Sequence, residues 1–433
     1  SYDDIGEYNK LSHFWQIGTA QFLDQSLQTY ATNIRMAQLY MQLFHTFKES
    51  LGLKERKYFS WQERNNNLIF IFSAQVLGMA HAPTKTLLDR CYALKKYLKK
   101  EIVIINTAMQ IPAKGQAPFY GLINATYAEG LSDVKQLEFK GETFEFHQCE
   151  NKMPDIDIIK NVIEMVKTRK PEFILDIGGS DICADLCGLF VPQITISTVF
   201  SRIAFSCGEY QMVDKILTEE DKGELAILGV DAQKVKKTPF TFSFKEQTHH
   251  FTRKQLELWE DKIVLLVVGW RLDQEVDENF LEMLEQVIKK NDNIAVAFMG
   301  KFDLYDEKIK KYPKLLENSK NLGMQMDALA VVECCDLYVN PKRNGGGSSV
   351  SEALYKGLPA VTLPTGDVSV AAGELFWVED YFAMQEKILK YASEENYYKQ
   401  MSEKAKKRAE ELMNANNFVT VIQDVESQIS TNG

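Results

Sequence analysis

The sequence predicts an α/β fold built from two doubly wound parallel sheets, one after the other along the chain. Short apolar runs alternate with amphipathic stretches over most of the 433 residues, an order typical of parallel sheets covered by helices. The pattern stops at a polar segment near residues 236–260, which we interpret as the crossing between domains, and then begins again. Ligands of such sheets bind at the carboxyl ends of the strands, so we expect a cleft between the two domains.

The individual elements follow from hydrophobic periodicity and from turn residues. Expected strands lie at 68–72, 101–106, 173–177, 193–199, 263–268, 294–299, 336–339 and 360–363. Expected helices lie at 86–99, 157–167, 278–290, 328–335, 377–392 and 397–413, and residues 1 to about 60 also have a helical pattern. We therefore expect four segments, at 1–64, 65–240, 241–415 and 416–433.

Composition limits the classes of function. The net charge of −10 and the pI of about 5.4 argue against a nucleic-acid binder. No run of about 18 apolar residues predicts a membrane span, and residues 1–20 do not resemble a secretion signal. The chain begins at Ser1, so we expect upstream residues or a processed terminus. Seven cysteines without zinc spacing indicate reduced thiols and a cytoplasmic location.

The most informative stretch runs from 339 to 361, where a β-rich segment ends at a polar turn and a helix follows. The turn and the start of the helix contain Asn344, Gly345, Gly346, Gly347, Ser348 and Ser349. Glycines let the backbone approach a ligand closely, and the N–H groups at a helix start favour phosphate. Glu352, about one turn into the helix, is placed to accept hydrogen bonds from a ribose. The pattern favours a nucleotide diphosphate, and a glycine-rich turn without a ligand is the alternative.

Basic residues follow other strand ends of the same predicted sheet. Arg271 and Lys301 come after two strands, and Lys342 and Arg343 come after a third. A departing diphosphate needs its charge neutralised, which Arg, Lys and helix N-termini can do without a metal. No Asp-x-Asp follows a strand end to hold a divalent ion, since 155–157 opens a helix where a cap is expected. We therefore predict no metal, with solvated surface roles as the alternative for Arg271 and Lys301.

Residues 263–415 resemble the donor-binding domain of GT-B nucleotide-sugar glycosyltransferases. The resemblance lies in the order from Gly269 and Arg271 through Ala-Val-Val-Glu-Cys-Cys-Asp-Leu-Tyr-Val-Asn-Pro to Glu-Ala-Leu-Tyr-Lys-Gly-Leu-Pro-Ala-Val. The turn, its hydroxyl residues and the following acid look most like the O-GlcNAc transferases and the bacterial cytoplasmic N-glycosyltransferases. This implies a GT-B fold with two Rossmann-like domains facing a cleft, an N-terminal helical segment (1–64), an acceptor domain (65–240) and a donor domain (241–415). It also implies that Ser348 and Ser349 hold the diphosphate and Glu352 the ribose.

The sequence departs from that family pattern in three ways. The turn has one extra glycine, and the acid is Glu352 where the O-GlcNAc enzymes tend to have Asp. The large retaining families place a Glu eight residues before the ribose acid, where this chain has Asn344. The missing Glu favours an inverting reaction.

An inverting transfer needs a base near the acceptor, and the first α/β domain offers two candidates. His81 lies in the first strand–helix loop, with Lys85 starting the helix; a structural hydrogen-bonded histidine is the alternative. Asp181 follows Gly178-Gly179-Ser180, where a helix cap is the alternative to a catalytic role. An aromatic pair at 119–120 is a candidate acceptor loop.

The resemblance implies a metal-independent glycosyltransferase that moves a sugar from a nucleotide-diphosphate donor, which we expect to be a UDP-sugar, to a protein or glycan. The donor is a substrate, so no cofactor is expected. Two alternatives share the fold: a nucleotide-sugar 2-epimerase, and a non-catalytic partner of another glycosyltransferase. We expect no nucleic-acid partner and no membrane span, and the sequence leaves the oligomeric state, the sugar and the acceptor open.

Overall fold

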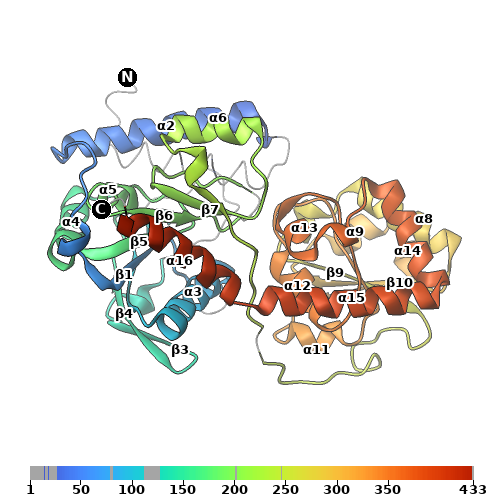
Figure 1. The fold of residues 1–433 in the computed structure, drawn as a ribbon. Helices are drawn as coiled ribbons and strands as arrows, with labels where there is room; N and C mark the ends of the chain where they lie inside the picture. Colours follow the sequence, from blue (N-terminus) through green and yellow to red (C-terminus); the bar gives the residue numbers. More distant parts are fainter. Residues whose placement is uncertain are drawn as a thin grey trace. The chain divides into compact units, whose positions relative to one another are not determined.

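The computed structural model describes residues 14, 18, 27–78, 81–111, 127–199, 202–244 and 246–431. The chain forms two compact units: residues 1–239 together with 415–433, and residues 240–414 (Figure 1). The predicted aromatic pair at 119–120 lies outside the described residues. Each described helix is too short or too polar to cross a lipid bilayer.

The first unit is built around an eight-stranded sheet in the order β3-β4-β2-β1-β5-β6-β7-β8. Its strands are β1 (Asn65–Ser73), β2 (Glu101–Asn106), β3 (Gln136–Phe139), β4 (Glu142–Gln148), β5 (Pro171–Ile177), β6 (Gln193–Ile196), β7 (Tyr210–Val213) and β8 (Val235–Lys237). All neighbouring pairs are parallel except β3 and β4, which form an antiparallel hairpin at one edge. The carboxyl ends of the other strands therefore share one edge of the sheet.

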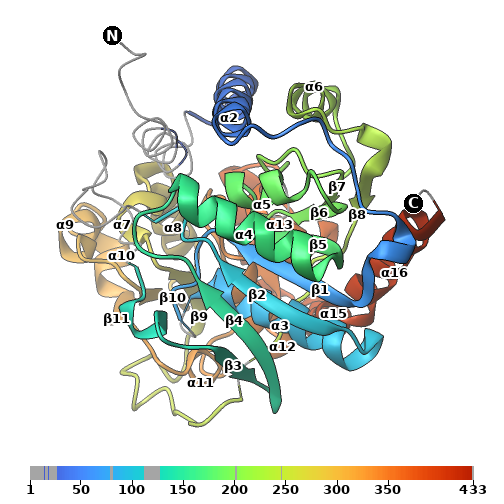
Figure 2. The ribbon, with the colours of Figure 1, turned by 90° about the vertical axis from the view of Figure 1, so that its left-hand side faces the viewer.

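Helices cover both faces of this sheet (Figure 2). They are α2 (Tyr30–Ser50), α3 (Ala82–Leu98), α4 (Ile156–Arg169), α5 (Ile182–Cys187), α6 (Glu219–Leu228) and α16 (Asn416–Thr431). Alternate residues of β1 (Leu68, Phe70 and Phe72) pack into one core with apolar residues of α2, α4 and α5. The C-terminal helix α16 lies beside α3, so the last residues of the chain return to the first unit.

The second unit contains a five-stranded parallel sheet in the order β11-β10-β9-β12-β13. Its strands are β9 (Ile263–Gly269), β10 (Ile294–Gly300), β11 (Ser319–Gly323), β12 (Leu337–Val339) and β13 (Ala360–Val361). Its helices are α7 (Leu272–Glu275), α8 (Glu278–Lys290), α9 (Tyr305–Ile309), α10 (Pro313–Glu317), α11 (Ala328–Val332), α12 (Gly347–Tyr355), α13 (Gly366–Ala372), α14 (Tyr381–Ser393) and α15 (Glu395–Met413). The turns after β9, β10 and β12 therefore meet at one edge of this sheet.

Most predicted elements are confirmed, including β2 and α8 at their predicted bounds. The prediction of helix over residues 1 to about 60 is confirmed at 30–50 and is wrong at 51–60, which form turns and extended backbone. Most of residues 1–26 lie outside the described residues. The sequence reading missed β3, β4, β7, β8 and β11. Their side chains are partly polar or their runs very short, so the apolar pattern there is weak.

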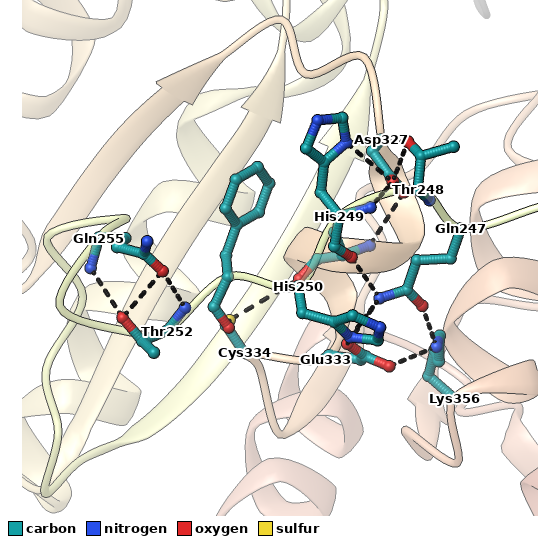
Figure 3. A network of polar contacts seen from close by, with 12 residues as sticks. Gln247, Thr248, His249, His250, Thr252, Gln255, Asp327, Glu333, Cys334 and Lys356 are labelled. Atoms are coloured by element: carbon teal, nitrogen blue, oxygen red, sulfur yellow. Dashed lines mark hydrogen bonds and ion pairs between the residues drawn. The ribbon is translucent and has the colours of Figure 1, made fainter.

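The polar segment that we interpreted as a domain crossing is fixed to the second unit from residue 240 onward. Asp327, the cap of α11, accepts hydrogen bonds from the backbone N–H groups of Thr248 (2.7 Å) and His249 (2.9 Å) (Figure 3). Although burial acts in the opposite direction, these bonds lower the pKa of Asp327 well below its usual value.

A second anchor of this segment is the Glu333 carboxylate. It accepts hydrogen bonds from Gln247 (2.7 Å) and Lys356 (2.5 Å) and lies 3.0 Å from Nδ1 of His250 (Figure 3). Burial opposes the charge, yet these partners lower the pKa of Glu333 to about 2. The segment is thus held along α11 by charge-assisted hydrogen bonds.

Candidate functional site

The glycine turn joins β12 to α12 and presents the start of that helix at the carboxyl edge of the sheet. Gly346 is the residue before the helix and has φ of +96°, a left-handed conformation that favours glycine. The first helical hydrogen bond runs from the N–H of Val350 to the carbonyl of Gly346. The N–H groups of Gly347, Ser348 and Ser349 precede it and have no acceptor in the described part of the chain, as at any helix start.

Arg343 braces the turn from inside the unit. Its side chain is only 4% exposed, and Nη1 donates to Glu275 (3.0 Å) while Nη2 donates to the hydroxyl of Tyr338 (2.9 Å). Although burial opposes the charge, Tyr338 and Glu275 raise the pKa of Arg343. A Cβ at Gly346 would lie 2.6 Å from Nη2, so the turn closes directly over this guanidinium. We had grouped Arg343 with the phosphate-ready residues, but the structure shows it as a buried support.

The two serines of the turn differ in their surroundings. The hydroxyl of Ser349 lies 2.8 Å from that of Tyr338 and 3.0 Å from the carbonyl of Gly346, and Arg343 approaches it at 3.4 Å. Ser349 therefore belongs to the bracing network. Ser348 is half-exposed, and in the described part of the chain its hydroxyl has no partner. Of the two serines, Ser348 therefore stays the predicted contact for a ligand.

Glu275 connects the turn after β9 to the glycine turn. One carboxylate oxygen pairs with Arg343, and the other accepts from Arg271 at 3.0 Å. The guanidinium of Arg271 also approaches Gly345, since a Cβ built there would lie 3.6 Å from Nη2. Arg271 is thus held at the mouth of the turn, with 29% of its side chain exposed.

The remaining predicted donor residues lie near the same edge. Lys301 follows β10, is half-exposed, and has Asp303 at 3.4 Å. Asn344 is half-buried, and its carbonyl accepts from the N–H of Asp367 (2.7 Å). Glu352 is half-buried on α12, one turn beyond the glycines. The structure therefore brings the glycine turn and Arg271 together directly and places Lys301 at the end of the neighbouring strand.

Tyr338 and Glu275 have structural roles that the sequence reading missed. Tyr338 is fully buried within β12. In the sequence it has no feature that separates it from other strand residues. Glu275 stands four residues after Arg271, a spacing that predicts a helical ion pair. The sequence thus offered a signal for the pairing of Glu275 with Arg271. It offered none for the pairing of Glu275 with Arg343, which lies 68 residues away.

No cluster of three or more acidic, His or Cys side chains suited to a metal ion occurs among the residues described above. The donor set at the glycine turn consists instead of N–H groups, a hydroxyl and guanidinium. These groups stabilise oxyanions rather than cations. What the turn can hold chemically is therefore a phosphate or diphosphate group.

His81 of the first unit is the residue before α3, at the carboxyl edge of the first sheet. Its Nδ1 lies 3.0 Å from the hydroxyl of Thr84, which also accepts from the N–H of Leu77 (3.2 Å). Burial, with help from Lys85, lowers the pKa of His81 to about 4, so the imidazole is neutral at pH 7. A base role requires the tautomer whose Nδ1–H donates to Thr84, which leaves the Nε2 lone pair available.

Asp181 is fully buried at the start of α5. It caps that helix by accepting from the N–H of Ala184 (3.1 Å), and it also accepts from the hydroxyl of Thr107 (2.5 Å). Burial raises the pKa of Asp181 to about 7 although both bonds stabilise the carboxylate. The capping interpretation is confirmed. A catalytic role stays a prediction, and it requires a movement that uncovers the carboxylate.

Residues 249–408 match the family model described as Glycosyl transferases group 1. This range contains Arg271, Lys301 and the whole glycine turn. No curated protein matches the chain.

Solved structures resemble the chain in fold. A mutant of the O-GlcNAc transferase from Thermobaculum terrenum aligns with a TM-score of 0.66 and 10% identity, covering 98% of this chain and 78% of that one. Anabaena HepE in complex with UDP aligns with a TM-score of 0.55 and 12% identity, covering 84% and 100%. A putative UDP-N-acetylglucosamine 2-epimerase from Listeria monocytogenes aligns with a TM-score of 0.52 and 13% identity, covering 84% of this chain and 98% of that one. These likenesses confirm the predicted GT-B fold class.

Proposed function

We propose that this GT-B glycosyltransferase transfers a sugar from a UDP-sugar to a protein or glycan acceptor, without a metal and with inversion of the anomeric centre. The observation that carries the proposal is the glycine turn, where the start of α12 carries the half-exposed Ser348 and the guanidinium of Arg271 approaches Gly345. UDP as the nucleotide is supported by the similar Anabaena fold, which was solved with UDP and with UDP-glucose. Seven unpaired, buried cysteines support a cytoplasmic location.

The donor side of the reaction follows from charge. As the bond between the anomeric carbon and the diphosphate oxygen breaks, negative charge grows on the leaving group. Arg271 and the N–H groups at the start of α12 are fixed before the reaction, so they stabilise that charge without reorganising. Glu352 accepts hydrogen bonds from the ribose and fixes the nucleotide's register along α12.

The acceptor side requires a nucleophile on the opposite face of the sugar. Its oxygen or nitrogen attacks the anomeric carbon while its proton passes to a base, which we assign to Nε2 of His81. The neutral imidazole of His81 is in the protonation state that this role needs. Asp181 of the same unit is the second candidate for the base, and this role requires that its buried carboxylate become exposed.

Replacement of Glu352 by alanine should weaken UDP binding by about 1–3 kcal/mol, the range for losing a charge-assisted hydrogen bond. Isothermal titration with UDP measures this directly. The matched control is Glu403→Ala on α15, an exposed acid whose carboxylate pairs with Lys406. Equal UDP affinity in the Glu352 variant and the wild type would remove Glu352 from the nucleotide site.

Replacement of His81 by alanine should lower kcat about a hundredfold, a typical loss for a general base, and leave the Kd for UDP within twofold. Because the pKa of His81 is about 4, the acid limb of kcat/KM should fall near pH 4 rather than 6.5. His147→Ala is the control, since His147 pairs with Glu145 on β4. Unaltered turnover in the His81 variant would show that this histidine is structural.

The epimerase alternative differs in its need for an acceptor. Incubation of the protein with UDP-N-acetylglucosamine alone, followed by mass spectrometry and NMR of the sugar, tests it. A transferase leaves the configuration at C2 unchanged and consumes donor only when acceptor is added. Accumulation of the 2-epimer without acceptor would overturn the proposed transfer.

A further inference from the structure

The first unit has a cavity of about 440 Å³ that the proposed reaction does not use. It is lined by Lys57, Tyr58, Phe59, Ser60, Glu63, Arg64, Pro192, Glu209, Tyr210 and Ile429. Arg64 precedes β1, Pro192 precedes β6, and Tyr210 begins β7, so the cavity lies at the amino edge of the parallel sheet. His81 and Asp181 lie at the carboxyl edge. We call this cavity the amino-edge pocket.

Arg64 is the most informative residue of the amino-edge pocket. It is 95% buried, with a relative exposure of 5%, and its Nη1 donates to the carbonyl of Glu172 at 2.9 Å. Its Nε is buried without a hydrogen-bond partner, and no hydrogen bond in the described part of the chain uses Nη2. Nε and Nη2 form the edge of a guanidinium that binds carboxylate or phosphate through two parallel bonds. A buried guanidinium with this edge unused is costly unless an acceptor occupies it.

The charges of the amino-edge pocket also favour an anion. Its two acids already have partners: Glu63 accepts from the N–H and hydroxyl of Ser60 (2.8 and 2.9 Å), and Glu209 pairs with Lys234. Lys57 at the mouth is exposed and forms no ion pair with any described residue. Glu172 and Glu209 attract Arg64, and Glu63 attracts Lys57, but neither cation forms a close ion pair with a described residue, so both can take an incoming oxyanion.

The walls of the amino-edge pocket are partly apolar and include aromatic rings. Tyr210 is buried and Tyr58 and Phe59 are half-buried, which provides aromatic surface beside the guanidinium. The volume lies within the range for small-molecule sites. The hydroxyl of Tyr58 is buried without a well-formed hydrogen bond, and the nearby Glu209 carboxylate contributes with burial to raise its pKa.

We propose that the amino-edge pocket binds a small molecule that carries one carboxylate or phosphate group on a flat apolar body. The oxyanion seats on the Nε and Nη2 edge of Arg64 with Lys57 above it, and the apolar body packs against Tyr58, Phe59 and Tyr210. The site is separate from the glycine turn, which belongs to the other unit. We expect its occupancy to be independent of the nucleotide site.

Benzoate and phenyl phosphate are suitable probes. Benzene, which lacks the oxyanion, and inorganic phosphate, which lacks the apolar ring, serve as control fragments. Ligand-observed NMR titration of the full chain measures their affinities. We expect at least one of the two probes to bind in the millimolar range or better and each fragment to bind more weakly. The probe that binds more tightly, benzoate or phenyl phosphate, identifies the preferred group as carboxylate or phosphate. No binding of either probe up to 10 mM would overturn the proposal.

Variants separate the amino-edge pocket from other surfaces. Arg64→Lys removes the two-bond edge and should weaken the probe about tenfold, whereas Arg169→Lys, at an arginine that pairs with Glu145, should not. Lys57→Gln at the exposed mouth should weaken it about threefold without affecting folding. Saturating UDP should leave the probe bound. Displacement by UDP, or equal affinity in Arg64→Lys, Lys57→Gln and wild type, would place the probe elsewhere and overturn the assignment.

Discussion

An Arg343→Met variant should lose about 3–5 kcal/mol of unfolding free energy, the cost of removing one partner from a buried ion pair. The substitution leaves the Glu275 carboxylate, which is 9% exposed, without its buried cation. It also removes the donor to Tyr338 beneath the glycine turn. Because the turn closes over this guanidinium, UDP affinity should fall at least tenfold at a temperature where the variant is still folded.

Urea unfolding followed by circular dichroism measures the first effect, and UDP titration at low temperature measures the second. A second substitution, Glu275→Gln in the Arg343→Met background, removes a buried carboxylate that keeps only the partly exposed Arg271 as its partner, and should restore part of the stability. Lys399→Met on α15 removes an exposed ion pair with Glu395 and should leave the midpoint unchanged. Wild-type stability of Arg343→Met would show that this pair does not brace the turn.

Gly346→Ala should cost about 2–4 kcal/mol of stability and reduce UDP affinity at least tenfold. Part of the cost is the left-handed backbone at φ of +96°, and part is overlap of the new methyl group with the guanidinium of Arg343 at 2.6–3.0 Å. The guanidinium cannot yield easily, because Glu275 and Tyr338 hold it on both sides. Relief of the overlap must therefore move the turn itself.

Gly323→Ala is the matched control. Gly323 also has a positive φ, +61°, but a Cβ there meets no atom within 4 Å. It should cost only about 1 kcal/mol, the backbone term alone. The difference between the two variants in chemical denaturation reports the steric overlap together with the extra backbone strain at φ of +96°, and UDP affinity should change only at Gly346. Equal losses in both variants would mean that Arg343 does not define the shape of the turn.

The sequence predicted the alternation of strands and helices well where apolar runs were long. The bounds of β2 and α8 agree with the prediction, because a buried strand and an amphipathic helix each impose a strong local period. The hairpin of β3 and β4 was missed because its burial is partial and its residues are mixed. Residues 51–60 read as helix from composition, but they run extended and Phe59 bonds to Phe190. That partner lies 131 positions away, and no local pattern indicates it.

The candidate site shows the same division. The glycines, Ser348 and the start of α12 were evident from sequence, because turn residues and helix starts are local features. The inward hydroxyl of Ser349, the burial of Arg343 and the closed position of Asp181 were not. Each depends on which side of a strand or helix faces the core, and on partners such as Tyr338 and Thr107.

Sequence by itself determined the two α/β units and the glycine turn between a strand and a helix, since backbone propensity and hydrophobic period act over neighbouring residues. Only the tertiary structure decided that Glu275 joins Arg271 and Arg343 beneath that turn, and that Arg64 keeps one guanidinium edge unused in a pocket at the amino edge of the first sheet. A charged group's role is set by burial and by partners brought from distant positions, and these exist only once the sheets are assembled.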